Sequence, residues 1–227
     1  MKIDAIIPAF NESERVGLTI QALKTMDSIG RIIVVDDGSS DATSTVAMAA
    51  GAEVIRFKKN RGKSAAVSAG VLESKALWIL LLDADLAETA TEAQLLVKAV
   101  LLDQAADVSI AKFPVVPGRG GGMGLAVKVS RWGSQILGGW KLQAPLSGQR
   151  CMKRAHLFSV FPLPYGFGLE TALNIRMGRL KYSVIEVETK MDHRVTQNDS
   201  NGLRHRLRQL FHLSLVLIRE ALRHVPT

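Results

Sequence analysis

Short apolar runs alternate with segments of helical character along the first half of the chain. We expect five strands, at residues 3–8, 31–35, 52–57, 76–82 and 107–112; the first of them is a continuous apolar run, which is typical of a strand buried on both faces. Helices are expected between them, with Asn11 and Asp41 as the caps of the first two. Strands that alternate with helices predict an α/β fold with a single Rossmann-like, doubly wound and mostly parallel sheet.

The pattern changes after residue 112. Residues 117–124 include five glycines and predict a loop, and we expect helices at 125–137, 154–160 and 168–177 and a strand at 182–190. Residues 113–202 therefore form an extension of the same domain, packed on residues 1–112. The last part, 203–227, predicts an amphipathic terminal helix. One side of this helix consists of Leu203, Leu207, Leu210, Phe211, Ser214, Leu217, Ile218, Ala221 and Leu222.

The composition is that of an ordinary globular protein, with 47% apolar and 22% charged residues among 227. Cys151 is the one cysteine of the chain, so neither an internal disulfide nor a zinc site built from cysteine pairs is expected. The N-terminus, MKIDAIIPAF, lacks the pattern of a signal peptide, and the apolar run 215–218 is far too short to cross a bilayer. We therefore expect a cytoplasmic protein.

The formal net charge is +8, and residues 190–227 carry seven Lys and Arg against three acids. A basic protein can favour nucleic acid, anionic lipid or phosphorylated ligands. Nucleic acid is disfavoured because the basic tail lacks the interleaved aromatic side chains on which bases stack. For the terminal helix three interpretations stay open: it packs on its own domain, on a second copy in a homodimer, or peripherally on the inner face of an anionic membrane.

Acidic residues follow two of the expected strands directly. Asp36 and Asp37 come after the second strand, and Asp83 and Asp85 flank Ala84 after the fourth. Ligands of open α/β sheets bind at the carboxyl ends of strands, and residues two apart on an extended chain point the same way. Such carboxylates could hold a divalent cation and a diphosphate, but turns and helix caps are also rich in Asp. The residues alone leave both interpretations equally open.

Two glycine-containing segments imitate nucleotide-binding motifs. Gly62-Lys63-Ser64 ends like a phosphate-binding P-loop, but Phe57 occupies the place of the first glycine, so the phosphate cradle is broken. The glycines of 118–124 follow two prolines and do not open the first strand-to-helix turn, which a dinucleotide fingerprint requires. We therefore reject both a P-loop NTPase and a dinucleotide-binding protein.

Four separated motifs of the first half occur in a characteristic order. They are Ile6-Ile7-Pro8-Ala9-Phe10-Asn11-Glu12, Val34-Val35-Asp36-Asp37-Gly38-Ser39-Ser40-Asp41, Asn60-Arg61-Gly62-Lys63 and Leu82-Asp83-Ala84-Asp85. This order resembles the family 2 type of glycosyltransferase with a GT-A fold. The resemblance implies that Asp85 binds Mn²⁺ or Mg²⁺ and that the first half binds a nucleotide-sugar. The donor-binding residues that it implies are Pro8, Ala9, Phe10, Glu12, Asp36, Asp37, Lys63, Asp83 and Ala84.

The second half resembles a narrower group, the glucosyl-3-phosphoglycerate synthases. The matching pieces are Pro145-Leu146-Ser147-Gly148, Pro164-Tyr165-Gly166-Phe167-Gly168-Leu169-Glu170 and His193-Arg194. The resemblance implies that Ser147 and Gly148 join the donor site, that Lys63 touches donor phosphate and that His193 completes the metal shell. It also implies an acceptor site made of Arg119, Glu170 and Arg194. The chain departs from that group at Gly121, where the group has Thr, and at Val195, where it has Asn.

The expected function is a metal-dependent glycosyltransferase, with Asp85, Glu170 and Lys63 as catalytic residues. A UDP-sugar such as UDP-glucose is the expected donor. An anionic small molecule or a polyprenyl phosphate is the expected acceptor, because Lys141 and Arg150 add to the cations of the later half. The alternatives are a non-catalytic nucleotide-sugar-binding module and a basic nucleic-acid-binding protein. Each residue also has a plain interpretation: His193, Lys63 and Arg119 as surface residues, and Glu170 as an acid in the first turn of a helix.

Overall fold

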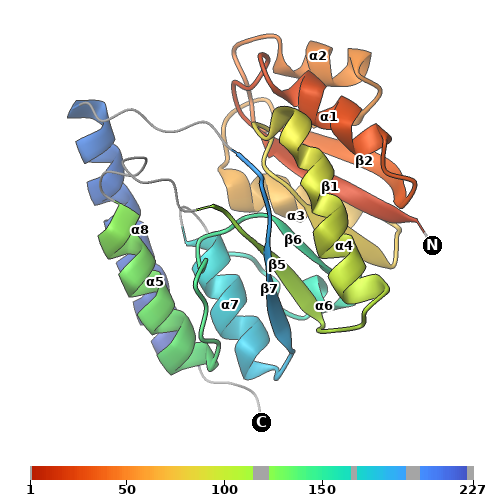
Figure 1. Cartoon of the computed structure of the whole chain (residues 1–227). Helices are drawn as coiled ribbons and strands as arrows, with labels where there is room; N and C mark the ends of the chain where they lie inside the picture. Colours follow the sequence, from red (N-terminus) through yellow and green to blue (C-terminus); the bar gives the residue numbers. More distant parts are fainter. Residues whose placement is uncertain (1, 115–122, 165–167, 193–199, 224–227) are drawn as a thin grey trace.

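The computed structural model describes residues 2–114, 123–164, 168–192 and 200–223, with backbone alone for 123 and 200–209. Its described strands form one seven-stranded sheet in the order β3-β2-β1-β4-β6-β5-β7 (Figure 1). Strand β6 is antiparallel to both of its neighbours, and the other pairs are parallel. The strands are β1 (Ile3–Ala9), β2 (Ile29–Asp36), β3 (Glu53–Arg56), β4 (Trp78–Leu81), β5 (Val108–Lys112), β6 (Arg150–Lys153) and β7 (Val184–Glu188).

Helices cover both faces of this sheet. The side chains of β4 alternate between two cores: Trp78 and Leu80 lie in one, and Ile79 and Leu81 lie in the other. All four residues are buried, as is typical of a strand between two helical layers. The helices are α1 (Val16–Lys24), α2 (Thr43–Ala49), α3 (Lys63–Glu73), the 3-10 helix η1 (Ala87–Glu92), α4 (Ala93–Leu101), α5 (Met123–Gly138), α6 (Arg154–Phe158), α7 (Leu169–Arg179) and α8 (Ser200–Leu222).

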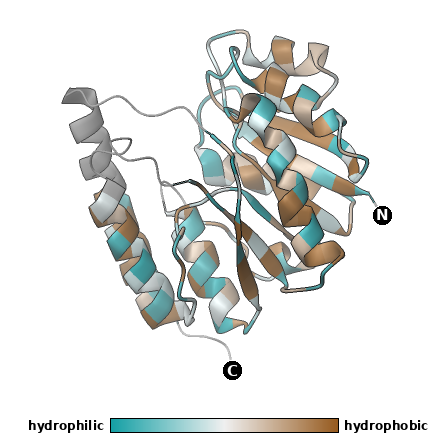
Figure 2. Ribbon diagram, in the orientation of Figure 1, coloured by the Kyte–Doolittle hydropathy of each residue, from teal (hydrophilic) through white to brown (hydrophobic). Residues whose placement is uncertain are grey.

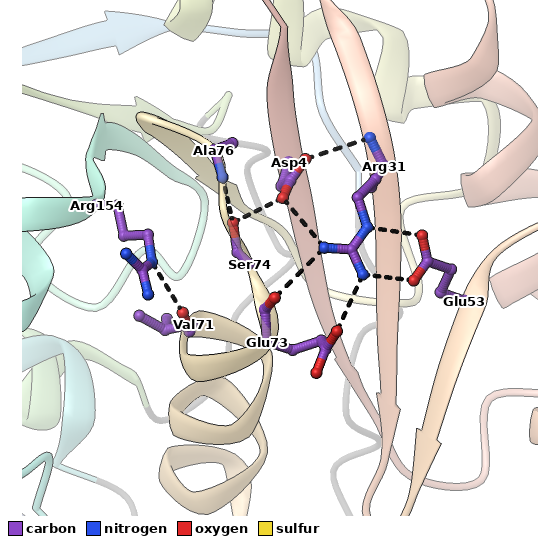
Figure 3. Close-up of polar contacts among 8 residues, drawn as sticks. All are labelled: Asp4, Arg31, Glu53, Val71, Glu73, Ser74, Ala76 and Arg154. Atoms are coloured by element: carbon purple, nitrogen blue, oxygen red, sulfur yellow. Dashed lines mark hydrogen bonds and ion pairs between the residues drawn. The ribbon is translucent and has the colours of Figure 1, made fainter.

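A polar network joins the amino ends of the strands (Figure 3). Arg31 of β2 pairs with Glu53 of β3 at 2.5 Å and with Glu73 at the end of α3 at 3.1 Å. Asp4 of β1 is buried and accepts the hydroxyl of Ser74 at 2.7 Å. These contacts tie α3 to three strands at the edge of the sheet opposite to the carboxyl ends. They stabilise the sheet and leave the other edge for a ligand.

Helix α7 lies between the sheet and the outer helices α5 and α8 (Figure 1). Glycines bring the helices close together: a Cβ on Gly138 would lie 2.6 Å from the Cα of Ile175, and one on Gly133 would lie 2.3 Å from Leu217. The hydroxyls of Ser130 and Thr171 share a hydrogen bond of 2.6 Å between α5 and α7. In the part of the chain that is described, no helix is both long enough and apolar enough to cross a membrane.

The sheet agrees with the predicted α/β class, and three details of the prediction were wrong. Strand β6 was not predicted, because it has four residues and a cation at each end. Asn11 does not cap a helix: its φ is 56°, its Oδ1 accepts the N–H of Ser40, and α1 begins only at Val16. Asp41 lies one residue ahead of the N-cap of α2, although its carboxylate accepts the N–H of Thr43 at 3.0 Å.

A further difference concerns which side chains of the terminal helix are buried. Among the described side chains of α8, residues 210–222, the buried apolar ones are Leu213 and Val216, with exposed fractions of 1% and 2%. Phe211, Ile218 and Leu222, which the helical period places on the predicted apolar side, are 61%, 56% and 75% exposed. The helix packs on α5 and α7 of its own domain through a face that the 3.6-residue period alone did not identify.

Candidate active site

The carboxyl ends of β1, β2 and β4 meet at one edge of the sheet. The pairing places Ala9 beside Asp36 and Ile6 beside Leu81, so the loops that follow these strands start side by side. The N–H of Asp37 donates to the carbonyl of Ala9 at 2.8 Å. Helix α3 begins at the same edge with Lys63, and α7 brings Glu170 there. All four predicted donor-binding motifs therefore lie at the edge where ligands of open α/β sheets bind.

Asp36 and Asp37 are buried and point to protein partners. The carboxylate of Asp36 accepts the N–H of Ser39 at 2.8 Å and the hydroxyl of Ser44. Asp37 accepts the N–H groups of Arg61 and Gly62 at 2.7 and 2.8 Å. Both carboxylates thus order the loop after β2 and the segment that leads into α3. They set the shape of this edge whether or not they also contact a ligand.

The first sequence motif, residues 6–12, is hydrogen-bonded to the loop that follows β2. The N–H of Asn11 donates to Ser39 at 2.9 Å, and the N–H of Glu12 donates to Thr43 at 2.8 Å. Phe10 lies between these two points and the end of β1, and 46% of it is exposed. An aromatic side chain held at a fixed place with a free face can stack on a planar ring.

Lys63 joins two acids at the centre of the site. Its Nζ lies 2.7 Å from Oδ1 of Asp83 and 2.9 Å from Oε1 of Glu170, so α3, the loop after β4 and α7 meet at one ammonium. Burial opposes the charged form of Lys63, but the two carboxylates outweigh it and raise the pKa of the ammonium above its ordinary value. Lys63 is also the first residue of α3, and the N-terminus of a helix is a place where phosphate binds well.

Gly148 packs directly against this cluster. A Cβ at this position would lie 2.7 Å from Nζ of Lys63 and 3.2 Å from Oδ1 of Asp83. Ser147 is buried beside it, and its hydroxyl donates to Oε1 of Gln149 at 3.2 Å. Pro8 lines the same small cavity as Lys63, Asp83, Gly148 and Glu170. The structure therefore brings together residues that the sequence motifs had named separately.

Gln149 and Arg150 complete the cluster. Gln149, which was not predicted, donates from Nε2 to Oδ2 of Asp83 at 2.6 Å. Arg150, predicted only as one cation of the later half, is fully buried and lines the cavity beside Glu170. Its Nε donates to the carbonyl of Ser147 at 3.0 Å, while both Nη atoms have no hydrogen-bond partner among the described residues. Burial lowers the pKa of Arg150 to about 10, although Glu170 opposes this shift.

The sequence signal for these two residues is their position directly after the Ser147-Gly148 motif. That signal does not say where the side chains point. Arg150 pairs with Leu81 across β6 and β4, so it lies on the face of the sheet that α3 and α7 cover. A cation on this face, next to the carboxyl ends, can offer a positive charge to Glu170 or to an anionic ligand.

The loop after β4 carries the remaining acidic residue of the predicted metal site. The carbonyl of Asp85 accepts a hydrogen bond of 2.7 Å from Arg15, and Ala84 is buried with its carbonyl bonded to Thr19 at 2.8 Å. Thr89 binds the backbone of Asp192, with 3.1 Å from its Oγ1 to the N atom. Carboxylate oxygens in this loop suit a hard cation such as Mg²⁺ or Mn²⁺. The described residues do not themselves form a cluster of three or more His, Cys, Asp or Glu.

Three predicted residues lie outside the described residues: Arg119, His193 and Arg194. The predicted metal pair of Asp85 and His193 therefore stays a prediction, as does the acceptor role of the two arginines. Lys141 is exposed on the surface, away from the residues that line the cavity.

Comparison with known proteins identifies the family. The model of glycosyl transferase family 2 matches residues 4–143. The dolichyl-phosphate beta-glucosyltransferase of Mus musculus is 34% identical over 100 residues, which cover 37% of this chain and 31% of that protein. Glycosyltransferase AglJ of Haloferax volcanii is 26% identical over 211 residues, which cover 86% of this chain and 65% of that protein. The chain thus spans less than two thirds of the length of these relatives.

Solved structures share the fold. Glucosyl-3-phosphoglycerate synthase of Mycobacterium tuberculosis, in complex with Mg²⁺ and UDP, superposes with a TM-score of 0.78 at 23% identity, over 96% of this chain and 79% of that one. The same enzyme with Mn²⁺, UDP-glucose and phosphoglyceric acid gives a TM-score of 0.76 at 24% identity, with the same coverage. These neighbours confirm the predicted GT-A fold. Because the family model covers more than half of the sequence, this chain belongs to glycosyl transferase family 2.

Proposed function

We propose that this chain is a metal-dependent glycosyltransferase that transfers a hexose from a UDP-sugar, such as UDP-glucose, to a phosphate-bearing acceptor. The observation that carries the proposal is the cluster of Lys63, Asp83 and Glu170 at the carboxyl ends of the strands. It lies at the edge of the sheet where this fold class binds ligands and at the start of a helix of eleven residues. The relative from Mus musculus is a dolichyl-phosphate beta-glucosyltransferase, which supports sugar transfer to a phosphate-bearing acceptor here.

The donor would lie along the carboxyl ends of β1, β2 and β4. Phe10 and Glu12 would contact the nucleoside, together with Pro8 and Ala9, on a frame that Asp36 and Asp37 hold in place. Lys63 would contact the diphosphate, because its ammonium stands at the helix terminus and carries its charge at any physiological pH. Gly148 would leave the room that this contact needs, since a side chain there would displace the ammonium.

Asp85 and His193 are the proposed ligands of Mn²⁺ or Mg²⁺, with Asp83 and Ala84 at the donor phosphates. When bound, such an ion supplies positive charge next to the departing nucleoside diphosphate. The described backbone supports this pairing, because Asp192, the neighbour of His193, is hydrogen-bonded to the helix that follows Asp85. The neighbouring structures that contain UDP also contain Mg²⁺ or Mn²⁺, which agrees with a metal-dependent donor site.

Glu170 would hold the hydroxyls of the sugar or of the acceptor. It is 9% exposed, and as the second residue of α7 it stands where the helix dipole stabilises a negative charge. Lys63 leaves Glu170 when it contacts the diphosphate, so the carboxylate then becomes available to accept hydrogen bonds from hydroxyl groups. Arg119, Arg150 and Arg194 would bind the phosphate of the acceptor, since a guanidinium offers a planar pair of donors.

Binding of nucleotide-sugars tests the donor half of this proposal. UDP-glucose with Mn²⁺ should raise the melting temperature of the protein, because a ligand that binds only the native state stabilises it. GDP-glucose should raise it less. Asp85→Ala should lose the effect of Mn²⁺ while keeping its fold, and Asp103→Ala, which changes an exposed acid, should behave like the wild type. A shift by GDP-glucose alone, or an unchanged response of Asp85→Ala, would contradict the proposed donor or the proposed metal ligand.

Hydrolysis separates an enzyme from a binding module. A glycosyltransferase usually hydrolyses its nucleotide-sugar slowly, with water in place of the acceptor. UDP should therefore accumulate slowly from UDP-glucose with Mn²⁺, and more rapidly when the correct acceptor is present. Tight binding of UDP-glucose without release of UDP under any acceptor would favour the non-catalytic module instead.

A further inference from the structure

Exposed apolar side chains gather on the two outer helices. Half of the large apolar residues that are exposed in the described part of the chain lie on α5 and α8. They are Leu125, Trp132 and Ile136 on α5, at 58%, 59% and 62%, and Phe211, Leu215, Ile218 and Leu222 on α8, at 61%, 38%, 56% and 75%. The spacing of each set keeps it on one face of its helix. We call these seven side chains the outer face.

The two stripes belong to one surface. Helices α5 and α8 pack side by side, with Leu217 seated over Gly133 (Figure 1). The side of α8 that faces α7 is already packed within the domain, because Val216 contacts Gly168 and Glu220 forms an ion pair with Arg176 at 2.5 Å. The outer stripe of α8 is therefore not needed for packing within the domain. Figure 2 shows apolar residues, interspersed with polar ones, along the visible side of α5.

Charge indicates what kind of partner this surface fits. Six Lys and Arg belong to α5 and α8, against a single acid, Glu220. Glu220 is 1% exposed and ion-paired, so it does not offset the cations at the surface. Lys128 and Arg219 are exposed on either side of the apolar stripes. A second copy of the chain would bring two such basic surfaces together, whereas an anionic surface would match them.

The outer face also lies close to the edge of the sheet that carries the candidate active site. Ser130 of α5 contacts Thr171 of α7, and Val216 of α8 contacts Gly168 just before α7. Helices α5 and α8 both run in the same direction as α7. The turns of α5 before Ser130 and of α8 before Val216 therefore extend past the first turn of α7, which carries Glu170. A flat partner that covers the outer face would come close to the end of α7 that carries Glu170.

We propose that the outer face docks on an anionic lipid bilayer and that the acceptor phosphate is presented there by a lipid. An apolar stripe flanked by cations is the pattern of helices that lie in the membrane interface. The apolar side chains enter the boundary between head groups and acyl chains, and Lys128 and Arg219 contact the anionic head groups. The acceptor part of this inference rests on the proposed transferase function, and the docking part does not.

Vesicle sedimentation of the full chain tests the docking. The chain should pellet with vesicles of phosphatidylcholine and phosphatidylglycerol, far less with phosphatidylcholine alone, and less at high salt, because ions screen the contact. Trp132→Ser combined with Ile136→Ser should lower the partition coefficient about tenfold or more, which is about 1.4 kcal/mol. Leu72→Ser combined with Leu102→Ser is the matched control, since these side chains are 63% and 74% exposed on α3 and just after α4, and it should pellet like the wild type.

The outcomes separate docking from chemistry. Equal pelleting of the surface variant, its control and the wild type would overturn the docking. So would loss of a dimer in the surface variant without any binding to vesicles, because the outer face would then join two copies. Wild-type binding of UDP-glucose by the surface variant, with transfer retained for a short, water-soluble polyprenyl phosphate but lost for the long-chain acceptor in vesicles, supports the proposal. Vesicle binding without binding of any UDP-sugar would leave the docking intact and refute the transferase function.

Discussion

Gly148→Ala should damage donor chemistry while leaving the fold nearly intact. The φ of Gly148 is not in the left-handed region, so space alone decides the effect. The new Cβ would lie 2.7 Å from Nζ of Lys63, and an ordinary contact needs about 3.5 Å or more. The flexible end of Lys63 must therefore move by about 1 Å, which breaks its 2.7 Å contact with Asp83. Because Lys63 is partly exposed, we expect a loss of only about 0.5–1 kcal/mol in unfolding free energy.

The effect on catalysis should be much larger than the effect on stability. A displacement of about 1 Å in a positioning group can lower kcat/KM by about a hundredfold. The assay compares release of UDP from UDP-glucose with urea unfolding, for Gly148→Ala and for Gly124→Ala. The control adds a methyl group in open space, so kcat/KM should match the wild type and the protein should be at least as stable, because Ala favours a helix over Gly. Wild-type kcat/KM in Gly148→Ala would refute the placement of Lys63 at the donor, and so would a loss of activity that unfolding fully explains.

Three further changes probe the rest of the account. Gly138→Ala should affect stability more than catalysis. Its unfolding free energy should fall by about 1–3 kcal/mol, because the new Cβ would lie 2.6 Å from the backbone of Ile175. A variant as stable as the wild type would contradict this packing. Arg150→Met should fold, since a buried unpaired charge is replaced by an apolar chain, yet lower kcat about tenfold through Glu170; unchanged kcat would make the guanidinium purely structural. Cys151, buried and with a pKa raised to about 12, should react with a thiol reagent only after unfolding; rapid labelling of the native protein would contradict its burial.

The parts of the fold that the sequence predicts are those with a local cause. Strands β1, β2 and β4 contain apolar runs that are largely buried, and the acids that end β2 and follow β4 mark the edge of the sheet where the site lies. Strand β6 has no such signal, because Arg150 and Lys153 enclose two apolar residues and its place is decided by pairing with β4 and β5.

The site was predictable as a set of motifs and not as a set of contacts. The motifs named Lys63, Asp83 and Glu170, but only the fold joins positions that are up to 107 residues apart. The inward direction of Asp36 and Asp37 also depends on loops that local patterns do not describe. For α8 the period identified an amphipathic helix, but two apolar sides compete for the core and only packing on α5 and α7 selects one.

The rate of UDP release from UDP-glucose, with Mn²⁺ and a polyprenyl phosphate acceptor, shows whether the cluster of Lys63, Asp83 and Glu170 is the catalytic centre. We expect measurable release by the wild type and a loss of about a hundredfold or more in Lys63→Ala and Glu170→Gln, because each removes a charge from the proposed reacting centre. Both variants should melt within a few degrees of the wild type. Release at the wild-type rate by either variant would contradict the claim that this cluster is the catalytic centre.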